Sequence, residues 1–177
     1  MTEYRRHFVP GGTYFFTVNL ANRSHGLLVE HIAPLRRAVA ETQREHPFEL
    51  DAVVILPDHL HAVWTLPPGD ADFSTRWRKI KACFSRALPR TERRSASRAG
   101  KGERGIWQRR FWEHSIRDAG DLRRHIDYIH YNPIKHGHCR TVADWPYSTF
   151  HRYVALGVYA KDWAGVVGED AGGEYGE

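Results

Sequence analysis

The sequence predicts an α+β domain with a ferredoxin-like antiparallel sheet and helices packed on it. A chain of 177 residues with 41% apolar content can form one packed domain and is too short for two domains of ordinary size. Segments with strand periodicity alternate with helical ones in the order β-α-β-β-α-(β)-α. Two of the strands meet at Pro57-Asp58, a turn-forming pair that indicates an antiparallel hairpin. This order favours an antiparallel sheet covered by helices.

The first half of the chain supplies three strands and one helix. Thr13–Leu20 follows two glycines and is rich in β-branched and aromatic residues, which predicts a strand. His31–His46 carries apolar residues on one side and charged residues on the other, which predicts a helix with Pro34 in its first turn. Two further strands are expected at Phe48–Leu56 and Leu60–Leu66.

The second half supplies two more helices. Phe73–Leu88 is predicted to be helical because large apolar residues recur in it at 3-4-4 spacing. Pro89–Gly105 is basic and lacks periodicity, so we expect a loop, followed by an extended aromatic stretch at Ile106–Ile116. Asp118 is a good N-cap for a last helix, which we expect to end near Asn132-Pro133 because the residue before proline avoids the α region.

We expect residues 1–160 to form the single domain and residues 161–177 to form an acidic, mobile tail. From Asp162 to Glu177 there are five acids, five glycines and no Lys or Arg, a composition that buries little surface. Such a tail either lies over a basic groove and competes with a polyanion or extends into solvent. Both interpretations stay open.

Positive charge dominates and is concentrated in one region. Lys and Arg number 26 against 21 acids, and the net charge is +5, which favours a polyanionic partner such as nucleic acid. Thirteen of the basic residues lie between Arg76 and Arg110. The candidates for DNA contact are cations that alternate with aromatic side chains in this region: Arg76, Arg78, Lys79, Lys81, Arg109 and Arg110.

Cysteine content and hydropathy suggest where the protein works. Cys83 and Cys139 are too few and too far apart for a disulfide framework or a thiolate zinc site. The longest aliphatic run, Val53–Leu56, is far shorter than a membrane span, and the N-terminus lacks the apolar core of a signal peptide. We expect a cytoplasmic, nucleoid-associated protein that does not bind membranes and is a monomer or weak dimer.

A candidate metal site lies in Asp58-His59-Leu60-His61. Strand alternation places both imidazoles on one face, within reach of one ion. The chain is too short for the barrel of a zinc amidohydrolase, and it lacks the second H-x-[ST] copy of a two-histidine phosphoesterase and the H-x-H-x-D-H of a metallo-β-lactamase. A two-histidine site with a third ligand from elsewhere remains, beside the alternative of two histidines packed on a polar sheet surface.

A candidate nucleophile lies on the last predicted helix. Leu122, Ile126 and Ile129 form an apolar stripe there, and Tyr128 and Asn132 lie one turn apart along its flank. Tyr128 is either an amphipathic packing residue or a nucleophile, with the amide oxygen of Asn132 offered to the same metal as the histidines.

Three runs of residues resemble the REP-associated tyrosine transposases, which belong to the single-tyrosine HUH transposases of the insertion-sequence type. They are HLH at His59–His61, FWEHSIRD at Phe111–Asp118 and, above all, YIHYNPIKHG at Tyr128–Gly137. Shorter matches extend the resemblance to nearly the whole chain: Tyr4–Arg6, Gly12–Thr17, Trp77–Ser85 and Trp145–Tyr153. It implies the HUH nuclease fold and cleavage of single-stranded DNA beside small hairpins through a 5′-phosphotyrosine.

By the same resemblance, His59 and His61 are metal ligands, Asn132 is the third ligand and Tyr128 is the nucleophile. Two imidazoles with amide and phosphate oxygens form a mixed donor set that favours Mg²⁺ or Mn²⁺. The sequence does not indicate which group takes the tyrosyl proton.

Several expectations accompany this assignment. His130 and Lys135 are expected to be surface or DNA-backbone residues. The basic insertion at Pro89–Gly105 is longer than in compact members of the family. Two other functions stay open: a domesticated, sequence-specific DNA-binding regulator without cleavage activity, and an RNA-binding module with exposed sheet aromatics, for which Tyr14-Phe15-Phe16 is a faint candidate.

Overall fold

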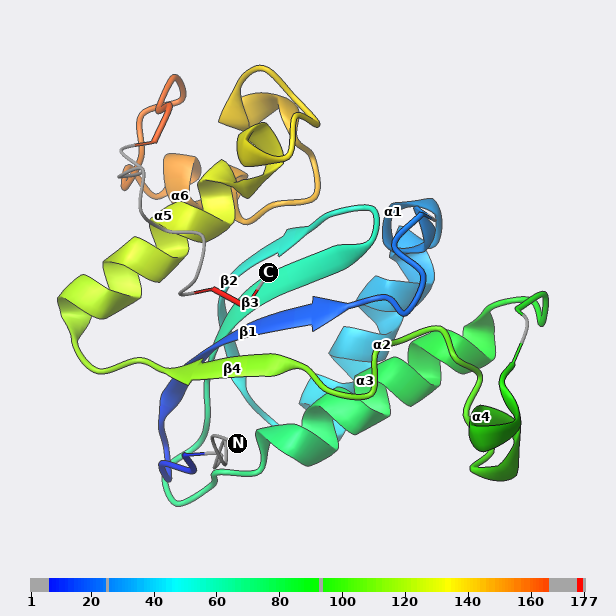
Figure 1. The fold of residues 1–177 in the computed structure, drawn as a ribbon. Coiled ribbons are helices and arrows are strands. Elements are labelled where there is room, and N and C mark those ends of the chain that lie inside the picture. The colour runs from blue at the N-terminus through cyan, green and yellow to red at the C-terminus, as the bar shows by residue number, and fades with distance from the viewer. Residues whose placement is uncertain (1–6, 25, 93, 166–174, 177) are drawn as a thin grey trace, which may run out of the picture.

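The computed structural model describes residues 7–24, 26–92, 94–165 and 175–176. Its elements follow one another along the chain as drawn in Figure 1. They are β1 (Thr13–Asn19), α1 (Leu27–Glu30), α2 (Ile32–Glu45), β2 (Glu49–Ile55), β3 (His59–Thr65), α3 (Phe73–Ala87), α4 (Ala96–Gly100), β4 (Trp112–Ser115), α5 (Ala119–Lys135), η1 (Val142–Asp144) and α6 (Phe150–Ala155).

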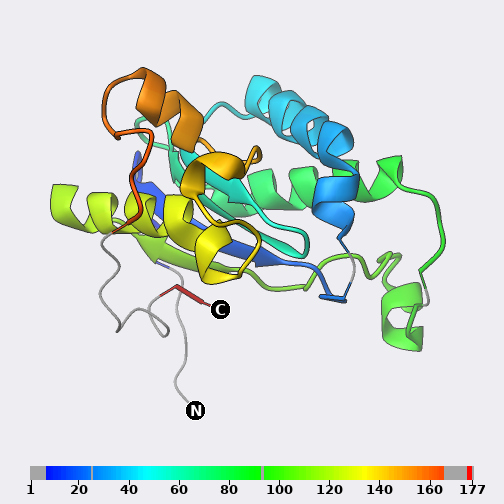
Figure 2. The same ribbon diagram turned by 90° about the horizontal axis from the view of Figure 1, so that it is seen from above.

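The four strands form one antiparallel sheet in the order β2-β3-β1-β4, which is the ferredoxin-like order and confirms the predicted fold class. Thr17 in β1 lies opposite both His61 of β3 and Trp112 of β4. Helices α2 and α3 pack against each other on one side of the sheet, and α5 crosses the other side over β2 and β3 (Figure 2). The sheet is therefore the middle of three layers.

Alternation along the strands divides the core between the two faces. On the α2–α3 side, Phe16 packs beside Trp64, whose ring stacks on that of Trp77 at 4.2 Å. On the α5 side, Phe15 and Ile129 belong to a second cluster. Tyr14, Phe15 and Phe16 are all fully buried, so the three residues that suggested the RNA-binding alternative are not exposed sheet aromatics.

Helix α5 starts as predicted and continues further than expected. The Asp118 carboxylate accepts a hydrogen bond from the backbone N–H of Asp121 at 2.8 Å, as an N-cap does. The predicted end near Asn132-Pro133 is wrong, because Pro133 lies in the last turn and the helix reaches Lys135. Proline removes one donor but its φ is compatible with a helix. Termination comes at Gly137, with a φ of +71°.

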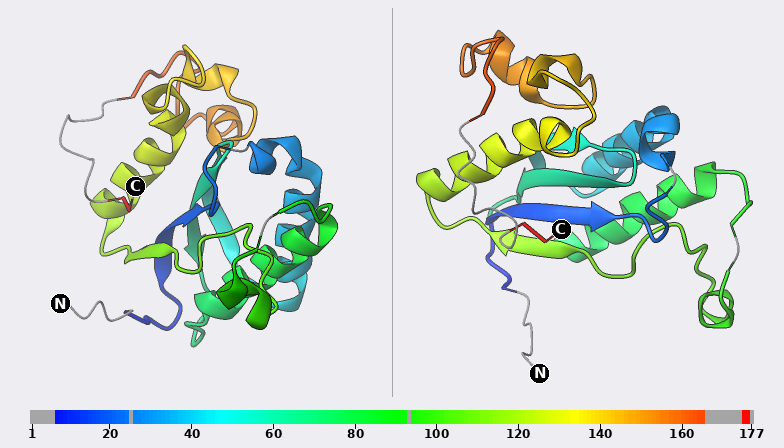
Figure 3. Two further views of the ribbon diagram at one scale, coloured as in Figure 1. Left: turned by 45° about the vertical axis from the view of Figure 1, so that its right-hand side comes forward. Right: turned by 45° about the horizontal axis from the view of Figure 1, so that its top comes forward.

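The segment between α3 and β4 is more ordered than a plain loop. A short helix, α4, interrupts the basic run at Pro89–Gly105, and the Arg104 guanidinium ties the run to the end of α3 by binding Glu92 and the carbonyl of Leu88. Of the stretch expected to be extended, only Trp112–Ser115 is a strand. Figure 3 shows α4 at the periphery, beside the end of α3.

The C-terminal segment covers the outer edge of the sheet. The backbone N–H of Ile55 in β2 donates to the carbonyl of Tyr147, and that of Thr149 donates to the carbonyl of Val53, each at 2.9 Å. This pairing removes the open edge that an outer strand otherwise exposes. Most of the predicted acidic tail, residues 166–174 and 177, lies outside the described residues, and its mobility stays a prediction.

Candidate active site

His59 and His61 lie on the face of β3 that is covered by α5. Their ring centroids are 5.0 Å apart, and both side chains are almost fully buried. The ring of His61 stacks near Phe15, in the core beneath α5. The prediction that strand alternation puts both imidazoles on one face is confirmed, and that face is buried beneath α5.

The Nδ1 atoms of both imidazoles are occupied by neighbouring side chains. Nδ1 of His59 donates to the carboxylate of Asp58 at 2.7 Å, and Arg23 donates to the second oxygen of that carboxylate at 2.6 Å. Burial disfavours the Asp58 carboxylate, but the hydrogen bonds from Arg23 and His59 outweigh it and hold the pKa of Asp58 below its ordinary value. These contacts fix the tautomer of His59 with Nε2 as the atom that can bind a ligand.

Thr17 has the same effect on His61. Its Oγ1 lies 2.8 Å from Nδ1 of His61 and 2.5 Å from the carbonyl oxygen of Tyr175. A carbonyl oxygen can only accept a hydrogen bond, so the hydroxyl of Thr17 donates its one proton to Tyr175. Towards His61 the same hydroxyl oxygen must therefore accept, and the proton in that hydrogen bond belongs to Nδ1 of His61. Nε2 of His61 is then left with its lone pair, as a metal ligand needs.

Helix α5 brings Tyr128 and Asn132 to the two histidines. The ring of Tyr128 is 5.3 Å from that of His61 in an edge contact, and the ring of His136 is 5.0 Å from that of His59. Asn132 lies between Tyr128 and His136 on the same side of the helix, and its side chain is fully buried. All four residues expected at the site are therefore gathered between β3 and α5.

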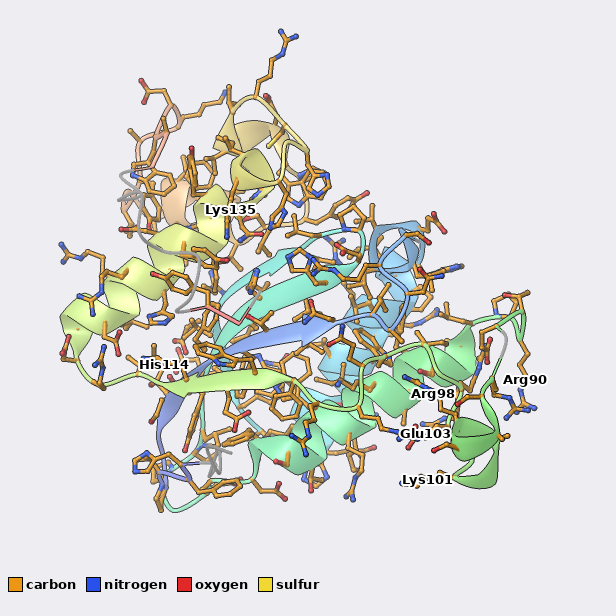
Figure 4. The ribbon with its side chains drawn as sticks, viewed as in Figure 1. Arg90, Arg98, Lys101, Glu103, His114 and Lys135 are labelled. Carbon is orange, nitrogen blue, oxygen red and sulfur yellow. The ribbon has the colours of Figure 1, made fainter. Side chains whose placement is uncertain are left out.

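Lys135 is exposed, as expected of a surface residue, but it also reaches the site, whereas His130 differs from the expectation. Lys135, in the last turn of α5 (Figure 4), donates a hydrogen bond from Nζ to Oη of Tyr128 at 3.1 Å. Seven residues advance a helix by nearly two turns, so the spacing from Tyr128 to Lys135 already placed them on one side. That signal depends on the helix continuing past Pro133.

His130 is wrong as a surface residue. The side chain is fully buried, and its Nε2 forms a hydrogen bond with Oγ1 of Thr149 at 3.0 Å. The ring packs among those of Phe150, Tyr153 and Tyr159. Burial, helped by the nearby charge of Arg152, lowers the pKa of His130 to about 3. It therefore anchors α5 to the C-terminal segment as a neutral ring.

The neighbouring tyrosines have different surroundings. Tyr131 is half-buried and faces Gly165, so closely that a Cβ at Gly165 would stand 2.6 Å from the Tyr131 ring. Tyr175 stacks on Tyr128, with ring centroids 3.7 Å apart and an angle of 8° between the rings. Sequence reasoning missed Tyr175, which lies near the end of the chain and is almost fully buried.

A second group of possible metal ligands lies where β4 meets the start of α5. His114, labelled in Figure 4, is 2.8 Å from the Asp121 carboxylate, and the ring of His125 stacks on that of His114 at 4.6 Å. Asp121 also binds the guanidinium groups of Arg117 and Arg124. Burial opposes ionisation of Asp121, but the hydrogen bonds that its carboxylate accepts from Arg117 and His114 outweigh it and hold its pKa far below the ordinary value. The Asp121 carboxylate already has these two guanidinium partners besides His114, so we interpret the group as structural.

The comparisons with known proteins agree with this geometry. Residues 12–132 match the model of the family described as "Transposase IS200 like". An Escherichia coli (strain K12) protein named REP-associated tyrosine transposase is 51% identical over 174 residues, covering 98% of each chain. The chain belongs to the REP-associated tyrosine transposases, within the IS200-like family.

Two further relatives support the same assignment. A Haemophilus influenzae protein is 48% identical over 166 residues, covering 93% of this chain and 94% of its own. A solved structure, "Structure of the REP associates tyrosine transposase bound to a REP hairpin", has a TM-score of 0.84 at 50% identity and covers 100% of this chain and 98% of its own. This solved REP-associated transposase thus has the same fold over nearly its full length.

A basic groove runs along α3 of this transposase, on the side of the sheet away from His59 and His61. Its volume is about 740 Å³. Cations from α3, α4 and the connecting segments line it: Arg78, Lys81, Arg86, Arg90, Arg98, Arg104 and Arg109. The one acid in its lining is Glu103, which pairs with Arg109. Figure 4 shows Arg90, Arg98 and Glu103 gathered beside α4.

The six cations expected at the DNA are not all in this basic groove. Arg78, Lys81 and Arg109 line it, whereas Lys79 pairs with Glu45 of α2 and Arg110 is exposed outside it. Arg76 is buried and binds Asp70 and the carbonyls of His46, Pro47 and Asp72. The proposal that Arg76 contacts DNA is withdrawn because its donors are already used within the fold.

In the described part of the transposase, none of the helices has the length and apolar character that a membrane crossing needs.

Proposed function

We propose that this transposase is a metal-dependent endonuclease and strand transferase that binds hairpin-containing DNA and cleaves a single strand through a 5′-phosphotyrosine at Tyr128. The observation that carries the proposal is the edge contact of Tyr128 with His61 across the interface of α5 and β3. A nucleophile is thereby held beside a candidate metal ligand.

The residues at this site fit a divalent ion. Asp58 and Thr17 occupy the Nδ1 atoms of His59 and His61, so two Nε2 lone pairs and the Asn132 amide oxygen form a mixed donor set that suits Mg²⁺ or Mn²⁺. When bound, such an ion polarises the scissile phosphate and reduces the charge that builds up during attack. The family uses divalent metals in general, and the identity of the ion here is part of the proposal.

The chain supplies the nucleophile and its orientation. The oxygen of Tyr128 attacks phosphorus, the P–O3′ bond breaks, and the electron pair stays on the 3′ oxygen. The phenolic proton passes to solvent, and the 3′ oxygen takes a proton from solvent. The resulting phosphotyrosine keeps the bond energy of the phosphodiester, so a 3′-hydroxyl can later attack it and rejoin the strand.

Hairpin DNA is the proposed partner because the 50% identical relative was solved with a REP hairpin. We propose that the basic groove along α3 contacts the sugar-phosphate backbone. Its cations are sequence-independent contacts that fix position rather than read bases. A DNA-binding regulator without cleavage remains the second candidate, because Tyr175 covers the ring of Tyr128 in this conformation.

Cleavage of labelled single-stranded hairpin DNA in Mn²⁺ or Mg²⁺ tests the proposal. We expect a DNA–protein adduct that survives denaturation, and its loss in His59→Ala and His61→Ala with hairpin binding largely intact. Asn132→Ala should lose activity less completely, since water can replace a neutral ligand. Hairpin binding without any adduct would favour the regulator, and normal cleavage by both histidine variants after chelation would reject the metal site.

A further inference from the structure

We propose that Lys135 is a catalytic residue that holds the attacking oxygen of Tyr128 and stabilises the negative charge on it. The inference rests on the proposed function, because it assumes that Tyr128 is the nucleophile. Lys135 touches the reacting atom directly: its Nζ donates to Oη of Tyr128 at 3.1 Å.

The position of Lys135 follows from the unexpected length of α5. The helix continues through Pro133 for one further half-turn, which places Lys135 seven residues beyond Tyr128 and on the same side. Nζ lies 4.9 Å from the centre of the Tyr128 ring, so the ammonium group sits beside the hydroxyl end of the ring. A helix ending at Asn132 would not provide this contact.

The surroundings of Tyr128 make a charged donor effective. The Tyr128 side chain is 3% exposed, and its ring contacts the neutral rings of Phe15 and Tyr175. Phenolate formation in such an apolar site is costly unless a cation is present. A hydrogen bond from an ammonium group to the oxygen is charge-assisted and is stronger than one between neutral groups. Lys135 thus places a positive charge at the Tyr128 oxygen itself, in addition to the ion proposed at the histidines.

The same contact serves both directions of the reaction. During attack the Tyr128 oxygen loses its proton to solvent and forms the bond to phosphorus. During rejoining, the oxygen leaves phosphorus with its electron pair. In each case Lys135 keeps its three protons and stabilises the partial negative charge on the Tyr128 oxygen, as a preorganised donor does.

Substitution of Lys135 separates chemistry from DNA binding. Lys135→Met removes the charge and keeps most of the stem, Lys135→Arg keeps the charge, and Lys79→Met removes a half-exposed ammonium group on α3 as a control. We expect Lys135→Met to lower the single-turnover rate of adduct formation at saturating hairpin DNA by roughly 100-fold. The hairpin Kd should stay within about threefold, because one phosphate contact at most is lost. Lys135→Arg should recover part of the rate, and Lys79→Met should match the unmodified protein.

Two outcomes overturn the inference. A Lys135→Met variant with an unchanged rate at saturation and a weaker Kd would make Lys135 a backbone-binding residue. If Lys135→Met and Lys135→Gln both lose rate and both unfold at a lower temperature than the unmodified protein, Lys135 has a structural role. Tyr128→Phe, measured alongside, separates the two proposals. If Tyr128→Phe still forms an adduct, Tyr128 is not the nucleophile. If Tyr128→Phe forms no adduct and Lys135→Met keeps full activity, only the role of Lys135 is rejected.

Discussion

Tyr175 lies flat on the ring of Tyr128, with centroids 3.7 Å apart, and its carbonyl oxygen accepts the hydroxyl proton of Thr17. Thr17 in turn holds Nδ1 of His61. One residue near the chain end is therefore linked both to the proposed nucleophile and to a proposed metal ligand. A phosphate that approaches Tyr128 from this side must displace it.

Removal of the Tyr175 ring is predicted to raise the rate of adduct formation. Tyr175→Ala should increase the rate most at low hairpin concentration, because DNA no longer competes with the stacked ring. Deletion of Gly168–Glu177 should do the same, with a further gain at low salt if the acids also repel DNA. Rates measured across salt concentrations separate the ring from the charge. Equal rates in all three proteins would mean that Tyr175 does not restrict access.

Asp58 is predicted to control metal affinity without touching the ion. Asp58→Asn keeps the size of the side chain but removes the charge that orients His59, and outer partners of this kind contribute roughly 10–100-fold to affinity. Mn²⁺ binding to the DNA-free protein, followed by electron paramagnetic resonance, should show that loss. Asp51→Asn is the matched control, since Asp51 is a half-buried carboxylate that binds Thr65 away from the site. Equal Mn²⁺ affinity in both variants would contradict the role of Asp58.

Neighbouring cations on α3 are predicted to differ in their effect on DNA binding. Arg78 lines the basic groove, whereas Lys79 points to Glu45 of α2. Arg78→Gln should weaken hairpin binding and reduce the slope of log Kd against log salt by about one, and Lys79→Gln should leave the slope unchanged. Fluorescence anisotropy at several salt concentrations measures both. If Lys79→Gln changes the salt slope more than Arg78→Gln does, the DNA-binding surface lies on the other side of α3.

Local patterns predicted the sheet and the central residues of the site, because these depend on short-range rules. Strand alternation placed His59 and His61 on one face, and Asp118 marked the start of α5. The burial of Arg76 was also visible in principle, since it lies one turn before Ile80 on the apolar side of α3. A composition-based search for cations treated it as surface.

Other features depend on contacts that no local pattern carries. Tyr175 reaches Thr17 across 158 positions of sequence, from a segment whose acids and glycines indicate a solvated tail. The contact of Lys135 with Tyr128 required a helix that continues through Pro133, against the usual preference of the residue before proline. Both exceptions lie at the proposed nucleophile.

The most direct test of the account is to identify the tyrosine that becomes linked to DNA. Adduct formed on labelled hairpin DNA is digested, and the nucleotide-bearing peptide is mapped by mass spectrometry in the unmodified protein and in Tyr128→Phe and Tyr131→Phe. Phenylalanine fills nearly the same volume, so each change removes a hydroxyl with little effect on folding. We predict linkage at Tyr128, no adduct in Tyr128→Phe and a normal adduct in Tyr131→Phe. Linkage at Tyr131, Tyr147 or Tyr153 would contradict the assignment.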